Sequence, residues 1–132
     1  MTRVNADIDP SELKRPHLLA ELRELTMVPA SLKRSLKTKT TQEVLKNIPQ
    51  NFTLNKGHVT FFYNKLTFLQ KRFDKLCEEM IQRGYAPDYT RRKAFDGFDD
   101  LWYNDWIATE EDNNIVRQRI AQRITEKPHL YR

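Results

Sequence analysis

Residues 57–83 of the chain read GHVTFFYNKLTFLQKRFDKLCEEMIQR, and this stretch decides the fold. Its main apolar residues recur at intervals of three and four, the spacing of one face of an α-helix. These residues are Val59, Phe62, Leu66, Leu69, Phe73, Leu76 and Met80. We predict one helix from about Val59 to Arg83, followed by Gly84 as its C-terminal cap. Further apolar residues widen this face, which is typical of a helix at the centre of a core.

Two other stretches carry the same spacing. Leucines on one stripe predict a helix from about Pro16 to Leu36, although Pro29 lies inside the pattern and is expected to kink or break it. A third helix is predicted from about Glu110 to Lys127, where Thr109 and Asp112 can form a capping box at its start. No strand pattern is convincing. The sequence therefore predicts an all-α protein with three main helices.

The connections between these helices differ in character. Residues 37–56 are basic and rich in Thr and Asn, and we expect a connection with one short helical turn. Residues 85–106 hold seven of the 14 aromatic residues and are acidic. We interpret them as an ordered loop segment whose rings pack on the helices. A platform for stacked bases is disfavoured, because acidic charge repels phosphates.

Composition excludes several classes of protein. The chain has 132 residues, which favours a single domain spanning 1–132. No apolar run approaches the roughly 20 residues that a membrane span needs. The first residues show no apolar signal region, so we expect a cytoplasmic protein without a membrane partner. The one cysteine, Cys77, cannot form an internal disulfide, and no Cys/His cluster suggests zinc. Because Cys77 lies on the apolar face of the 59–83 helix, we expect it in the core.

The net charge of +5 is unevenly distributed. Residues 1–83 hold 15 basic and 9 acidic residues, residues 84–114 hold 3 and 8, and residues 115–132 hold 5 and 1. One interpretation is a set of ordinary solvated faces. The other is a polyanion-binding surface built from both basic segments, with the acidic segment turned away. Composition does not choose between them.

Two features could carry chemistry. His17, Glu21 and Glu24 share one stripe of the first helix. They form either a solvated face with helical ion pairs or a carboxylate site at the edge of the core, where burial tunes the pKa. The second feature is Thr2, since a small second residue permits removal of Met1. The freed α-amine would titrate near 7.7–8.0, leaving about a tenth of it neutral at pH 7 and able to form a Schiff base.

Three segments together resemble the phage pyrimidine-dimer DNA glycosylase family, of the endonuclease V type. They are MTRVN at 1–5, HLLAELREL at 17–25 and GHVTFFYNKL at 57–66, which continues through Phe68-Leu69 and Lys71-Arg72. A weaker match covers the third helix. The resemblance implies a compact helical fold that binds damaged or abasic double-stranded DNA as a monomer and flips a nucleotide out of the helix. It places the protein in the cytoplasm of a phage host.

The resemblance also implies a reaction and its residues. The N-terminal amine, here that of Thr2, attacks C1′ of the damaged nucleotide to form an imine, and β-elimination then cuts the strand. Glu24 matches the catalytic carboxylate, and no metal or cofactor is implied. The matched DNA-binding residues are Arg3, His17, Arg23, Lys33, Arg34, Arg119 and Arg123. They come from the two basic segments.

Two departures from the family bear on lesion preference. Met27 stands where the family has an arginine, and the aromatic C-terminal tail tied to dimer recognition is reduced to Leu130-Tyr131-Arg132. An alternative is therefore a DNA-binding protein on the same fold without dimer-specific glycosylase activity. Another is a protein that binds a protein partner through the acidic aromatic segment.

Overall fold

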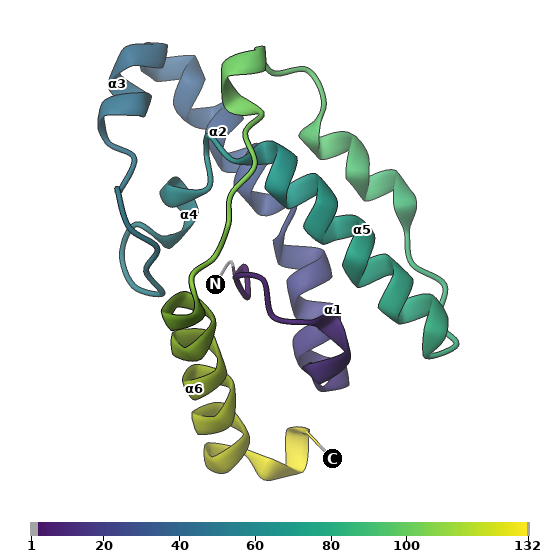
Figure 1. Ribbon diagram of the computed structural model, residues 1–132. Helices are drawn as coiled ribbons and strands as arrows, with labels where there is room; N and C mark the ends of the chain where they lie inside the picture. Colours follow the sequence, from purple (N-terminus) through teal and green to yellow (C-terminus); the bar gives the residue numbers. More distant parts are fainter. Residues whose placement is uncertain (1–2, 132) are drawn as a thin grey trace.

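The computed structural model describes residues 3–131, which form α-helices and short 3-10 helices joined by turns (Figure 1). The α-helices are α1 (Arg15–Glu24), α2 (Met27–Thr38), α3 (Thr41–Lys46), α4 (His58–Phe61), α5 (Leu66–Gln82) and α6 (Glu110–Glu126). The 3-10 helices are η1 (Pro10–Glu12), η2 (Tyr89–Phe95), η3 (Asp100–Trp102) and η4 (Pro128–Leu130). No strand occurs between residues 3 and 131, which confirms the predicted all-α class. Within the described part of the chain, none of the helices has both the length and the apolar composition that a membrane crossing requires.

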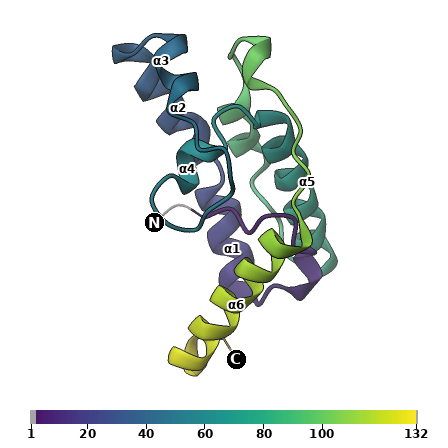
Figure 2. The ribbon, with the colours of Figure 1, turned by 60° about the vertical axis from the view of Figure 1, so that its left-hand side comes forward.

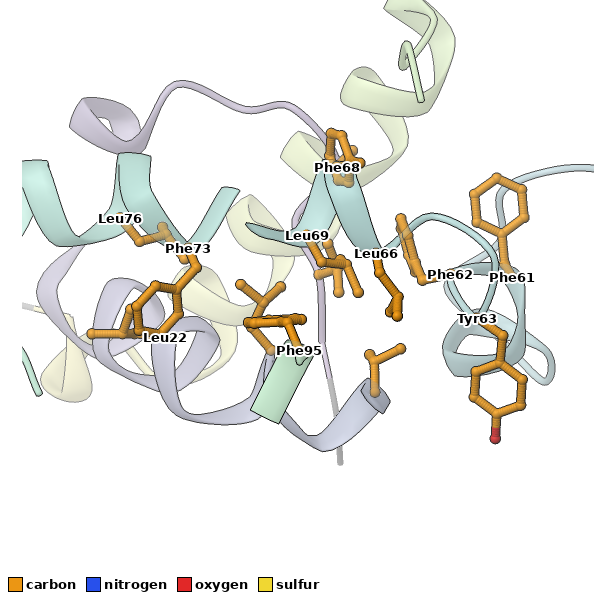
Figure 3. Close-up of a cluster of buried hydrophobic side chains, with 14 of the residues drawn as sticks. Leu22, Phe61, Phe62, Tyr63, Leu66, Phe68, Leu69, Phe73, Leu76 and Phe95 are labelled. Atoms are coloured by element: carbon orange, nitrogen blue, oxygen red, sulfur yellow. The ribbon is translucent and has the colours of Figure 1, made fainter. Parts of the chain in front are cut away.

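The apolar face of α5 forms the centre of the core, as its spacing predicts. Leu66, Leu69, Phe73 and Leu76 are fully buried, and the Phe73 ring lies beside Leu22 of α1 and makes an edge contact with the Phe95 ring of η2 (Figure 3). Burying each such side chain contributes about 1.5–3 kcal/mol. Cys77 is also buried at 1% exposure, and burial raises its pKa to about 11, so its predicted place in the core is confirmed.

The prediction of one helix from Val59 to Arg83 is wrong, because the chain turns between α4 and α5. Phe61, Phe62 and Tyr63 are all buried although they are consecutive. A continuous helix would point three consecutive side chains about 100° apart, so it could not turn all of them to one core. The turn removes this conflict, and Asn104 donates to the free carbonyl of Asn64 at 2.8 Å.

The predicted helix from Pro16 to Leu36 is broken, but one turn earlier than Pro29. The chain leaves the helix at Leu25 and Thr26, and Pro29 is the third residue of α2. Proline has no N–H for the carbonyl four residues before it, and its ring crowds that carbonyl. The Leu25 carbonyl accepts instead from the N–H of Val28 at 3.4 Å. Within the first turn of α2 the missing N–H of Pro29 costs nothing.

The other local predictions are confirmed. The 37–56 connection contains one short helix, α3, which a capping box of Thr40 and Glu43 begins. The predicted box of Thr109 and Asp112 begins α6, with both hydrogen bonds at 3.0 Å. The acidic aromatic segment packs most of its rings inward, whereas Tyr89 is 52% exposed. Trp102 is 1% exposed, and the Trp106 ring contacts those of Phe52, Phe61, Phe62 and Phe68.

The two ends of the described chain meet on α1. The segment 3–8 crosses α1 beside the start of α6, where the Asp7 N–H donates to Asn113 Oδ1 at 3.0 Å (Figures 1 and 2). After α6 the chain turns back, and the Tyr131 ring stacks on that of His17 near the beginning of α1. This arrangement places the basic C-terminal segment beside α1, whereas η2 of the acidic segment contacts α5 and α2.

Candidate active site

Glu21 of α1 is the most buried acid of the site. It is 1% exposed, and its carboxylate accepts four hydrogen bonds. Arg72 of α5 donates Nε and Nη2 at 2.8 and 3.0 Å, and Asn5 donates its backbone N–H and Nδ2 at 3.1 and 2.9 Å. Arg72 Nη1 also donates to the Ile8 carbonyl. Glu21 and Arg72 therefore hold segment 3–8 on α1.

Glu24 lies one turn further along α1 and is only half-buried. Burial raises the pKa of its carboxyl, and the nearby charge of Glu21 adds to this, while Arg23 opposes it. Of the two interpretations of the stripe, the structure supports a carboxylate at the core edge. A carboxyl of raised pKa can exchange protons closer to neutral pH than an ordinary glutamate can.

Glu24 lines a pocket of about 230 Å³ between α1, the N-terminal segment and α6. The pocket brings together residues from four places in the sequence: Arg3, Asn5, Pro16, His17, Ala20, Glu21, Arg23, Glu24, Arg123 and Tyr131. Three arginines around two carboxylates give a site that can bind an anion beside an acid. Five of the nine predicted site residues therefore meet here. Thr2 precedes Arg3 and lies outside the described residues.

His17 occupies one wall of this pocket, beneath Tyr131. The two rings are stacked with centroids 4.4 Å apart and planes inclined by 12°. His17 is 9% exposed, and neither ring nitrogen has a hydrogen-bond partner within residues 3–131. Burial lowers the pKa of His17, which favours the neutral ring. A contact of His17 with DNA would therefore require Tyr131 to move aside.

The remaining predicted basic residues fall into two groups. Arg119 lies with Arg123 on α6 in a second, adjoining pocket of about 470 Å³, which Lys127 and Tyr131 also line. Lys33 and Arg34 are exposed on α2 and belong to neither pocket. Within the described residues no group of three His, Cys, Asp or Glu side chains could hold a metal ion.

Sequence reasoning missed several residues that build the site. Asn5 and Arg72 lie within the quoted motifs, but their common partner Glu21 is 16 and 51 residues away from them. His58 accepts a hydrogen bond from the N–H of Val4, 54 residues away. Helical spacing carries no sign of such pairs. The one available signal was Arg72, a charged residue three positions after Leu69 on the apolar face of α5.

A small all-helical domain that gathers a half-buried acid and several arginines around one pocket is suited to a reaction on a polyanion. A model of the pyrimidine dimer DNA glycosylase family matches residues 1–93. The chain belongs to this family, and its members are DNA repair glycosylases, so its substrate is DNA. The match covers the N-terminal segment, α1 and α5, which together carry the acids of the site and their buried arginine partner.

Proposed function

We propose that this protein removes a damaged base, of the pyrimidine-dimer type, and cuts the strand at the resulting abasic site. The α-amine of Thr2, freed by removal of Met1, attacks C1′ of the flipped-out nucleotide. The bond between C1′ and the base breaks, and the base leaves with its electron pair. Loss of a proton from the attacking nitrogen and opening of the sugar give an imine. The imine acidifies the proton on C2′, whose removal expels the 3′ phosphate by β-elimination.

The observation that carries this proposal is the pocket shared by Arg3 and Glu24. Arg3 is the residue directly after Thr2, so the chain leads into the pocket that the acid lines. A fixed carboxylate stabilises the positive charge that develops on the sugar as the base leaves. Its raised pKa also suits the proton transfers of elimination.

Borohydride trapping tests the proposal directly. Reduction should convert the imine with abasic duplex DNA into a stable adduct, and peptide mapping should place the adduct on Thr2. The structure supplies a competing amine for comparison. Burial lowers the pKa of Lys65 to about 8, so it too would be partly neutral near neutral pH. The Lys65→Arg variant should form the adduct as the natural protein does. An adduct on Lys65, or none at all, would contradict the proposed nucleophile.

Arg119 and Arg123 should contribute to DNA affinity through phosphates. Each glutamine variant is expected to weaken binding to any duplex and to lower the slope of log affinity against log salt by about 0.9. Fluorescence anisotropy over a series of salt concentrations measures this slope. Lys93→Gln, in the acidic segment, is the matched control and should leave the slope unchanged. Equal slopes in all three variants would mean that α6 does not contact the DNA phosphates.

The alternative of a DNA-binding protein without dimer-specific activity draws on two observations. Met27 is 48% exposed at the position of the family's arginine, and Tyr131 covers His17. Nicking of ultraviolet-irradiated plasmid distinguishes the two functions. If the protein cuts abasic DNA but not irradiated DNA, it has the lyase activity without glycosylase activity on pyrimidine dimers.

A further inference from the structure

Side chains of several helices hold the N-terminal segment, and three of them bind its backbone on both sides of Ala6. Arg72 binds the Ile8 carbonyl, Glu21 binds the backbone N–H of Asn5, and His58 accepts from the N–H of Val4 at 2.9 Å. The last attachment is the nearest to Thr2 along the chain. Each residue advances the backbone by at most about 3.6 Å, so an anchor at Val4 limits how far the terminal amine can move.

His58 is oriented to act as an acceptor. Its Nδ1 lies 2.7 Å from the Thr53 carbonyl, which can only accept, so Nδ1 carries the proton. Nε2 of the neutral ring therefore presents a lone pair to the N–H of Val4. The His58 ring makes edge contacts with the rings of Phe52 and Phe62, with centroids 5.7 and 5.5 Å apart. His58 is 6% exposed, so these contacts hold its ring in place.

The surroundings of His58 favour its neutral form. Burial lowers the pKa of His58, and the charge of Arg119 adds to this, while the Thr53 carbonyl and the charge of Glu21 oppose it. If Nε2 were protonated, it would be a donor facing the N–H of Val4, which is also a donor. The hydrogen bond would then be lost, and the segment would be released at the point closest to its end.

We propose that His58 is a positioning residue that anchors the N-terminal segment at Val4 and thereby restricts the motion of the proposed nucleophile, the α-amine of Thr2. This inference rests on the proposed imine chemistry. His58 itself does not touch the substrate. It acts through the backbone, by reducing the conformational freedom of the nucleophile before DNA arrives.

Two substitutions of His58 distinguish the loss of its hydrogen-bond acceptor from a change in side-chain size. In His58→Gln, Oε1 can replace Nε2 as the acceptor for Val4. In His58→Asn, Nδ2 can still donate to the Thr53 carbonyl, but the side chain is too short to reach Val4. We expect the Asn variant to trap abasic DNA about 10- to 100-fold more slowly than the natural protein in a single turnover. The Gln variant should recover most of the rate.

The same proteins are measured for DNA affinity and unfolding midpoint. Affinity should change by less than about twofold, because the phosphate-binding arginines are retained. A scalar coupling between the Val4 nitrogen and His58 Nε2 in the nuclear magnetic resonance spectrum would report the anchor without any reaction.

Trapping rates that follow the unfolding midpoints of the two variants, with no advantage for Gln, would overturn the positioning role. Absence of the coupling in the folded natural protein would do the same. Failure of the proposed function is distinct, since the natural protein would then form no Thr2 adduct. That result would overturn both, whereas a trapping natural protein with unaffected Asn and Gln variants would overturn the role of His58 alone.

Discussion

Glu24→Gln is expected to lower the rate of strand cutting at an abasic site by about 10²–10⁴-fold while duplex DNA still binds. Glutamine keeps the shape of the side chain but cannot carry the negative charge that stabilises the sugar, nor exchange the protons of elimination. Single-turnover cleavage of an end-labelled abasic duplex gives the rate, and anisotropy gives the affinity. Glu78→Gln, an identical change on an exposed position of α5, should leave both unchanged.

The pH dependence of the cleavage rate provides a second test of the role of Glu24. Burial raises the pKa of Glu24 above its ordinary value of 4.5. Because the reaction uses the carboxylate, cleavage should be retained above this raised pKa and lost as pH falls through it. The Gln variant should lack that acid limb. Glu24 would be excluded from the mechanism if Glu24→Gln cuts at the rate of the natural protein. The same conclusion would follow if the cleavage rate of the natural protein does not fall at low pH.

Replacing Arg72 by leucine is expected to destabilise the fold by about 3–5 kcal/mol. The two side chains of the Arg72–Glu21 pair are 1% and 0% exposed, so the change leaves the carboxylate of Glu21 buried and without its positively charged partner. The N-terminal segment would also lose the bond to the Ile8 carbonyl. Chemical denaturation monitored by tryptophan fluorescence gives the free energy of unfolding.

An exposed ion pair supplies the control for this prediction. Lys71 and Asp105 are 2.6 Å apart, but their side chains are 61% and 52% exposed. Lys71→Gln should change the free energy of unfolding by less than about 1 kcal/mol, because water solvates the remaining charge. Equal effects of the two variants would mean that the Arg72 pair is not buried in solution.

The helix predictions succeeded or failed according to what determined each boundary. The start of α6 was predicted to the residue, because a capping box is a contact between residues three apart. The division between α4 and α5 was missed, because it depends on three consecutive aromatic rings finding separate partners across the core. Pro29 correctly indicated a break, but its position follows from where the Leu25 carbonyl finds another donor.

The sequence by itself determined the all-α class, the helix caps, the apolar face of α5 and the family motifs that point to Thr2 and Glu24. All of these depend on residues that are neighbours along the chain or on one helix face. Only the tertiary structure decided that Glu21 is a buried anchor, that Tyr131 covers His17 and that His58 holds the backbone at Val4. These contacts join residues 16 to 114 positions apart, and neither helical periodicity nor local capping extends over such separations.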